Sequence, residues 1–482
     1  MDHAIEGNRE DVILHGLIMK LFDVYERPYT TWIRLYNPDG SRDQLRAEMI
    51  QIENQKERPA AALYYASLGG LEKEVKALIR QGEDGNSQGG FFGNALQAAS
   101  HRGHGKVVQI LLDQGADINI QGGNYGNALQ AASQGGHTTI VQRLLENGAD
   151  INVPGGFYGS SLQAAAQGGH ETIVQELLSK GAHVNYQGGP FGCSLQAASQ
   201  GGHRRVVHML LDKGADINYQ GGPYGNTLQA ACCRGHKAIV QDLLNKGMNV
   251  NSYGGEYYSS LQAGCHGGHE DVIRILLDEG ADVNVQGGIH GSALQTACHG
   301  GFGKIVQMLL DKGADINMKG EPYGCALQAA SHGGHKGVIQ LLLKQGADKD
   351  VNYQGGKYGT ALQAACQGGY TEIIQILLDT GADVNIQGGK YGSALQVACR
   401  EGHENIVRTL LNNGAAINTQ GGLYGNALQA ACRGGHKGIV QMLLNKGVED
   451  INAQGGVYGS AIQAASSKGH DMIVQMLRDY GS

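Results

Sequence analysis

The sequence has little proline, little tryptophan and few charged residues. Only 7 of its 482 residues are proline and one is tryptophan, and charged residues make up 17%, below the usual quarter. Because its 78 glycines show no three-residue period and proline is scarce, a collagen-like chain is excluded. No run approaches about 18 apolar residues, so no segment is predicted to span a membrane. The net charge of −7 predicts no bulk affinity for nucleic acid.

Signals for secretion and for catalysis are also missing. The first residues, MDHAIEGNRED, are polar and acidic, unlike a secretory signal. We therefore expect a reducing compartment, the cytoplasm, with the nucleus as the alternative. The sequence has no nucleophile elbow, no spacing of metal ligands and no GxxxxGK loop followed by Ser or Thr. We expect no enzyme activity, no catalytic residues, no cofactor and no metal.

What the sequence does have is a repeat of 33 residues. A Leu-Gln pair, Leu96-Gln97 in the first full copy, recurs at this interval, and two longer steps coincide with the insertion Lys349-Asp350 and an extra residue near Glu449. The pattern predicts 13 copies in one domain, 59–482. Residues 1–58 are expected to form a helical N-terminal cap, with the remnant of an interface to a missing domain as the alternative. The copies start near residues 55, 88, 121, 154, 187, 220, 253, 286, 319, 354, 387, 420 and 454.

Each copy predicts two short helices and a turn. We number the positions of a copy 1 to 33, with Gln121 at position 1. Position 7 is mostly Asn, Ser or Thr, which cap helices, and positions 8–15 form an alanine-rich helix that the glycine at position 16 ends. Positions 18–27 form a second helix, and GADIN with QGG makes a turn and a hairpin finger. One helix pair cannot bury its apolar face alone, so we expect the copies to stack into an all-α solenoid.

The period, together with ALQAA, GGH, IVQxLL and GADIN, resembles the ankyrin repeat. The variant GGxYGNALQAAS and the leading ALYYASLGGL further resemble the C-terminal arrays of fungal NACHT–ankyrin proteins, which are NLR-like receptors. The resemblance implies a non-enzymatic scaffold for protein–protein interaction, acting as the recognition array of such a system. An intracellular scaffold or regulator, for example of transcription or of a metabolic pathway, is the alternative. The family's nucleotide-binding module is not in this sequence, so ATP-driven switching is not implied.

Several columns of the repeat are expected to be structural. Glutamine replaces the family's usual histidine at position 10, and its amide can tie neighbouring backbones together as a ladder. Position 5 is aromatic in nearly every copy, which predicts a stacked row, with a ligand-facing strip as the alternative. The histidines at position 17 are expected to bridge backbone groups. Equivalent positions of stacked helices lie about 8–10 Å apart, too far for a disulfide, so all nine cysteines should be free thiols.

The candidate binding surface comes from positions 4 and 14, where the copies differ most. The resemblance places these positions on the fingertips and at the end of the first helix, which line the ankyrin groove. Four basic side chains there predict an acidic partner segment near the C-terminal third. We expect a monomer that binds protein partners and contacts neither nucleic acid nor membrane. The candidate residues are Phe91, His101, Asn124, Phe157, His266, Ile289, His299, His332, Lys357, Lys390, Arg400 and Arg433.

The position-14 histidines, His101, His266, His299 and His332, allow two interpretations. A spacing of about 10 Å between copies would exclude a shared metal ion. Ordinary solvated side chains are the plain interpretation. A contact that is sensitive to pH, or that meets an anionic partner, is the alternative.

Overall fold

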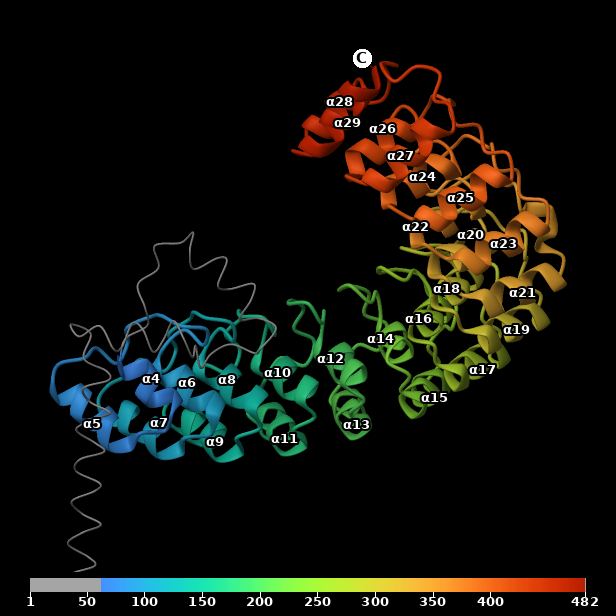
Figure 1. The fold of residues 1–482 in the computed structure, drawn as a ribbon. Helices are drawn as coiled ribbons and strands as arrows, with labels where there is room; N and C mark the ends of the chain where they lie inside the picture. Colours follow the sequence, from blue (N-terminus) through green and yellow to red (C-terminus); the bar gives the residue numbers. More distant parts are fainter. Residues whose placement is uncertain (1–61, 482) are drawn as a thin grey trace, which may run out of the picture. The chain divides into compact units, whose positions relative to one another are not determined.

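The computed structural model describes residues 62–481, and these contain 26 α-helices, one short 3-10 helix and two strands of two residues (Figure 1). The predicted cap, residues 1–58, lies outside the described residues. The chain divides into two compact units, the first ending at Ala231 and the second beginning at Cys232. Each unit is an array of helix pairs, as the 33-residue period predicts.

The first unit contains α4 to α13 and most of α14. Its helices are α4 Ala62–Leu68, α5 Glu72–Arg80, α6 Ala95–Arg102, α7 Gly105–Asp113, α8 Ala128–Gly135, α9 Thr138–Glu146, α10 Ser161–Gly168, α11 Glu171–Ser179, α12 Ser194–Gly201, α13 Arg204–Asp212 and α14 Thr227–Cys233.

The second unit contains α15 to α29. Its elements are α15 Lys237–Asn245, α16 Ser260–Gly267, α17 Glu270–Asp278, β1 Gln286–Gly287, β2 Gly291–Ser292, α18 Ala293–Gly300, α19 Gly303–Asp311, α20 Ala326–Gly333, α21 Lys336–Lys344, η1 Ala347–Asp350, α22 Ala361–Gly368, α23 Thr371–Asp379, α24 Ala394–Glu401, α25 Glu404–Asn412, α26 Ala427–Gly434, α27 Lys437–Asn445, α28 Ala461–Ser466 and α29 Asp471–Gly481.

The two helices of each repeat form two rows within a unit. Figure 1 shows α6, α8 and α10 in one row and α7, α9 and α11 in the other. Alanines of the first helices, such as Ala131 and Ala132, are fully buried, so neighbouring first helices approach closely. In the second helices Ile140, Val141 and Leu144 point into the same core and are at most 2% exposed. The continuous core expected from stacking is confirmed within each unit.

The helix ends follow the predicted caps. The Asn94 side chain accepts a hydrogen bond from the Gln97 N–H at 2.9 Å, and Gly103 ends the same helix at a φ of 82°, where a side chain would be strained. Cys193 occupies the cap position of α12 without making a side-chain cap bond, whereas Cys325 forms a capping box with Gln328 at the start of α20. The second helices end one residue earlier than predicted, as Asp113 does for α7. The insertion at Lys349-Asp350 forms the 3-10 helix η1.

Each finger is a tight hairpin that closes on itself. Gly122 bridges to Gly126, and the Gly122 N–H donates to the Gly126 carbonyl oxygen at 2.8 Å. In one repeat the hairpin is long enough to form β1 and β2, with Gln286 opposite Ser292. The predicted fingers are therefore confirmed.

Buried polar side chains join each repeat to the next. The Gln97 Nε2 group donates to the Gly126 carbonyl oxygen on the following finger at 3.0 Å, and Gln163, Gln196 and Gln262 donate to the equivalent glycines. The Gln130 amide donates to the Val153 carbonyl oxygen instead. At position 17, His137 Nε2 lies 2.8 Å from the His101 carbonyl oxygen. Both ladders confirm the structural roles expected for these columns. Within residues 62–481, no helix combines the length and apolar character needed to cross a bilayer.

Candidate functional site

The position-5 rings stack along the fingers, and we call them the finger row of each unit. In the first unit, the ring centroids of Phe92 and Tyr125 lie 5.5 Å apart and those of Tyr125 and Tyr158 lie 5.7 Å apart. In the second unit, Tyr391 and Tyr424 are separated by 5.7 Å, and Tyr424 and Tyr458 by 6.0 Å. The rings are nearly parallel, so the predicted stacked row is confirmed. The members are Phe92, Tyr125, Tyr158, Phe191 and Tyr224 in the first unit, and Tyr257, His290, Tyr323, Tyr358, Tyr391, Tyr424 and Tyr458 in the second.

The fingers lie closer together than the 8–10 Å expected between stacked helices. At the fingertips, the backbone N–H of Asn124 donates to the Phe91 carbonyl oxygen at 2.9 Å, and that of Val457 donates to the Leu423 oxygen at 3.0 Å. Hydrogen-bonded backbones approach to about 5 Å, whereas packed helix axes stay about 8–10 Å apart. The spacing of about 10 Å expected for the position-14 histidines was wrong, since the ring centroids of His299 and His332 lie 5.3 Å apart.

The position-14 histidines lie between rings of the finger row, and His101, His299 and His332 are half-buried there. His101 stacks between Phe92 and Tyr125, with its ring centroid 4.7 Å from each. His332 lies 4.1 Å from Tyr358 and 5.3 Å from His299. Burial is the main cause that lowers the pKa of His101 and of His332 to about 4. The interpretation as solvated side chains was wrong for these two residues, and both are neutral at physiological pH.

His266 is the exposed member of this set, and it joins a short hydrogen-bonded chain. Its Nδ1 lies 3.2 Å from Nε2 of His290, and Nδ1 of His290 lies 3.2 Å from the Tyr323 hydroxyl. Burial, followed by the neighbouring His266 and His299, lowers the pKa of His290 to about 4. Sequence reasoning did not select His290 as a site residue, although it is the one residue at position 5 of the full copies that is neither Phe nor Tyr. No group of three or more metal-ligating side chains occurs among residues 62–481.

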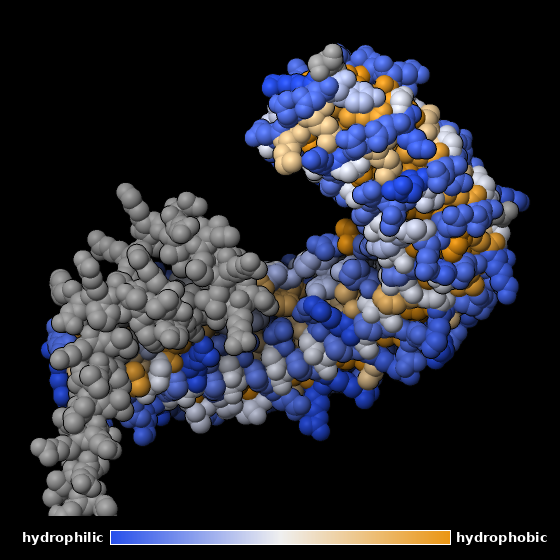
Figure 2. Space-filling model, viewed as in Figure 1, coloured by the Kyte–Doolittle hydropathy of each residue, from blue (hydrophilic) through white to orange (hydrophobic). Residues whose placement is uncertain are grey.

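The apolar candidates at position 4 differ in exposure. Phe157 is 47% exposed and Ile289 is 46% exposed, whereas Phe91 packs edge-on against Phe92 at 5.1 Å and Asn124 is half-buried. Tyr253, at position 1 of its repeat, is 43% exposed and was not selected from the sequence. On the face visible in Figure 2, apolar residues form narrow strips between hydrophilic ones. Phe91, Asn124 and Phe157 lie in the first unit and Ile289 in the second.

Three basic side chains lie over the finger row of the second unit, and we call them the basic finger patch. Lys357 Nζ lies 5.7 Å from the Tyr358 ring centroid, and Lys390 Nζ lies 5.3 Å from that of Tyr391. The Arg433 guanidinium carbon lies 4.6 Å from the Tyr458 centroid. These are cation–π distances, worth about 0.5–1 kcal/mol each at exposed sites.

No side chain within residues 62–481 compensates the charges of the basic finger patch. Within residues 62–481, Lys357, Lys390 and Arg433 make no ion pair. The Nε atom of Arg433 is buried and has no hydrogen-bond partner in the described part of the chain. The patch therefore offers three cations, one of them with an unused donor.

Arg400, the fourth predicted basic residue, has a different environment. Its Nε donates to the Tyr424 hydroxyl at 3.2 Å, and its guanidinium forms an ion pair with Glu401 at 2.7 Å. The expectation that Arg400 presents a free positive charge was therefore wrong. Glu401 follows Arg400 directly in the sequence, but the pattern alone did not reveal the pairing.

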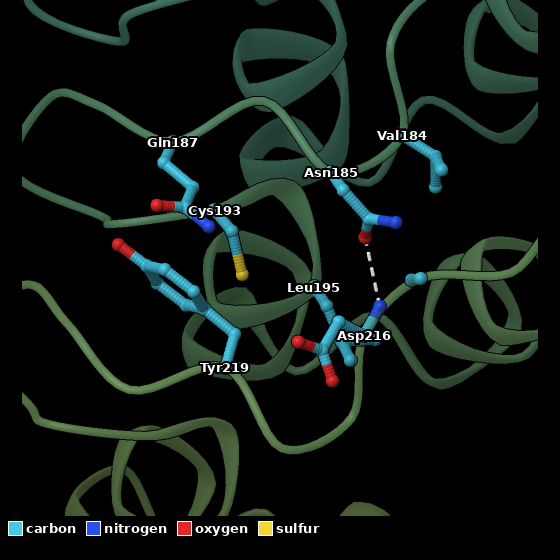
Figure 3. A pocket seen from close by; sticks show the side chains of 8 residues that line it. Val184, Asn185, Gln187, Cys193, Leu195, Asp216 and Tyr219 are labelled. Carbon is cyan, nitrogen blue, oxygen red and sulfur yellow. Dashed lines mark hydrogen bonds between the residues drawn. The ribbon is translucent and has the colours of Figure 1, made fainter.

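A small pocket in the first unit contains Cys193 and Tyr219 (Figure 3). Asn185 accepts a hydrogen bond there from the Asp216 backbone N–H at 2.8 Å, which is one step of a ladder that recurs in other repeats. Burial raises the pKa of the Cys193 thiol. A protonated thiol beside a structural ladder gives this pocket no nucleophile.

Comparison with known proteins identifies the family. The family model described as ankyrin repeats (3 copies) matches overlapping windows of the chain: 63–155, 96–188, 128–221, 195–287, 228–320, 263–354 and 326–421. The single ankyrin-repeat model matches 426–456. The chain is an ankyrin-repeat protein. The fold class predicted from the period is therefore confirmed, and ankyrin arrays serve as scaffolds for protein–protein interaction.

Two individual proteins are similar to parts of this ankyrin array. The azaphilone pigments biosynthesis cluster protein L of Monascus ruber is 42% identical over 109 residues, which cover 20% of this chain and 22% of that protein. The match thus spans about a fifth of the relative's length. The human ASB11 ankyrin repeat domain is 27% identical, with a TM-score of 0.40, and the match covers 46% of this chain and 98% of that domain.

Proposed function

We propose that this ankyrin array binds an acidic segment of a protein partner at the basic finger patch, and that it acts by binding and not by catalysis. The observation that supports the proposal is the row of three uncompensated cations, Lys357, Lys390 and Arg433, on one finger row. The whole chain carries a net charge of −7, so this local concentration of positive charge is not a property of the average surface. The half-exposed fingertips, such as Ile289, and the exposed His266 would add contacts on the same unit.

The test uses a fluorescent poly-glutamate peptide and the full chain. The triple variant Lys357→Ser, Lys390→Ser and Arg433→Ser removes the patch. A matched control, Lys344→Ser, Lys437→Ser and Lys446→Ser, removes the same charge from exposed second-helix positions. We expect the patch variant to lose most of the binding measured by fluorescence anisotropy, while the control retains it.

Added salt should weaken the wild-type interaction, because screening acts over about 10 Å at 0.1 M. Equal loss in the patch variant and in the control would show that only net charge matters and would contradict the proposed site.

The biological setting is a separate proposal. The resemblance of GGxYGNALQAAS and ALYYASLGGL to NACHT–ankyrin proteins supports a recognition array of an NLR-like system. A scaffold or regulator in a metabolic pathway is favoured instead by the similarity over 109 residues to a pigment biosynthesis cluster protein. Affinity purification with mass spectrometry distinguishes the two, since it would recover either a NACHT-containing chain or enzymes of one pathway.

A further inference from the structure

The spacing of the finger row specifies how the charges of an acidic partner must be arranged. Consecutive rings of the second unit are 5.7 Å apart from Tyr391 to Tyr424 and 6.0 Å apart from Tyr424 to Tyr458. Each ring carries one basic side chain: Lys390 lies over Tyr391, Arg400 contacts Tyr424 and Arg433 lies over Tyr458. Lys357 lies over Tyr358, the ring of the preceding repeat. From Tyr391 to Tyr458 the rings that carry these cations therefore follow a row with one step of about 6 Å per repeat, and Lys357 lies in the repeat before this row.

An extended peptide fits this step. In a β-strand each residue advances about 3.3 Å and alternate side chains point to the same face, so residues i and i+2 lie about 6.6 Å apart. The flexible stems of Lys357 and Lys390 can absorb the small difference from the step of the row. Residues i and i+3 of a strand point to opposite faces, and cannot both meet the row.

A helical partner could also match a 6 Å step, because residues i and i+4 of a helix are about 6 Å apart along its axis. That arrangement needs carboxylates at every fourth position, and like charges at this spacing destabilise a helix. Stacking of nucleic-acid bases is disfavoured for another reason, since Tyr424 is stacked on both faces, by Tyr391 and by Tyr458.

We propose that the basic finger patch recognises an extended protein segment with Asp or Glu at every second position, one carboxylate for each finger. This inference rests on the proposed function and specifies its partner. The third of the four fingers differs from the others, because Glu401 already compensates Arg400. A partner carboxylate at that finger meets an ion pair and not a free cation.

The first test compares two peptides of identical composition. One alternates glutamate and threonine over eight residues, and the other has two glutamates followed by two threonines, repeated once. The alternating peptide can place all its carboxylates on one face, whereas the paired peptide can place only half of them there. Each exposed charge pair is worth about two- to fivefold in affinity, so we expect the alternating peptide to bind the full chain roughly tenfold more tightly at low salt.

The second test is a variant that should gain binding. Glu401→Gln removes the partner of Arg400 at the end of α24 and keeps the shape of the side chain. It should tighten binding of the alternating peptide about two- to fivefold. The variant Glu404→Gln removes the same charge from an exposed second-helix position and serves as the control. A gain cannot result from misfolding, so this result does not depend on the triple variant.

The outcomes separate the inference from the function on which it rests. If both peptides bind equally and the triple patch variant loses both, the alternating register is overturned and the proposed function stands. If neither peptide nor poly-glutamate binds, both are overturned. Tighter binding of a peptide with glutamate at every fourth position, or of an oligothymidine, would overturn the extended protein segment as the partner.

Discussion

At the scale of single residues, the position-14 histidines are side chains whose neighbours decide their charge. His332 is stacked against Tyr358 and His299, and its pKa of about 4 lies below the ordinary value. Between that value and the unfolded pKa of about 6.5, the unfolded chain binds more protons than the folded one. Stability contributed by these histidines is therefore complete above about pH 6.5 and is lost as the pH falls toward 4.

We predict that His332→Gln makes the folded protein less sensitive to acid. Glutamine occupies the equivalent position in other repeats, for example Gln134 and Gln367, so the replacement suits the site. Thermal unfolding followed by circular dichroism at pH 7.5, 5.5 and 4.5 should show a smaller drop in midpoint for the variant than for the wild type. Parallel drops would mean that His332 titrates normally.

A substitution at position 10 tests how much the buried glutamines that join neighbouring repeats add to stability. Gln295 Nε2 donates to the Gly320 and Gly324 carbonyl oxygens at 3.3 and 3.1 Å, while its Oε1 accepts from the Ser292 N–H at 2.9 Å. Gln295→Ala removes the acceptor of the Ser292 N–H, while the two carbonyl oxygens keep the hydrogen bonds that Gly320 and Gly324 donate to each other. Urea unfolding should show a loss of about 1–3 kcal/mol for this variant.

Gln375→Ala is the control for this change. Gln375 is exposed and its amide donates to Asp379 within its own helix, so its loss should stay within about 0.5 kcal/mol. Similar effects of the two substitutions would show that the ladder adds little to stability.

At the scale of helices, the short second helices depend on packing more than on their own propensity. Each has nine residues in most repeats, which is too short to be stable alone in water. Leu276 is fully buried, so Leu276→Ala should cost about 2–5 kcal/mol. The control lies in the preceding repeat, where Leu244 of α15 is only half-buried. Leu244→Ala should cost about 1 kcal/mol.

Hydrogen exchange should locate the damage caused by Leu276→Ala. Because each repeat packs only on its neighbours, protection should fall in α15 to α19 and remain in helices farther away. Uniform loss of protection throughout the second unit would show a single cooperative unit instead.

The helices and fingers were predictable from the sequence because every copy repeats the same capping, turn and core residues. Asn or Ser at position 7, glycine at positions 16 and 28 and leucine at position 24 each act within one copy or between direct neighbours. The finger spacing was not predictable, because it depends on backbone hydrogen bonds between copies, such as that from Asn124 to Phe91. The burial of His332 and the pairing of Arg400 with Glu401 followed from that spacing and from side-chain geometry, which a column of residue types does not contain.

At the scale of the whole molecule, the cysteines report on both units at once. All nine are free thiols in the structure, and every one except Cys233 is buried. Burial raises the pKa of Cys193 in the first unit and of Cys265 and Cys366 in the second, and a protonated, buried thiol reacts slowly. The buried thiols are therefore protected from alkylating reagents only while the repeats around them stay packed.

We predict that iodoacetamide modifies only Cys233 rapidly in the native chain and all nine cysteines after denaturation. Cys233 is only half-buried, so the reagent can reach it. Burial raises the pKa of its thiol as well, so it should react more slowly than a fully exposed cysteine. Mass spectrometry of a time course identifies each modified residue, and Cys233→Ser should leave no rapid site. Modification of the buried thiols then measures local opening of the repeats that contain them. A native disulfide would contradict the repeat spacing from which the free thiols were predicted, and rapid reaction of Cys298 or Cys399 would contradict the closed core that protects them.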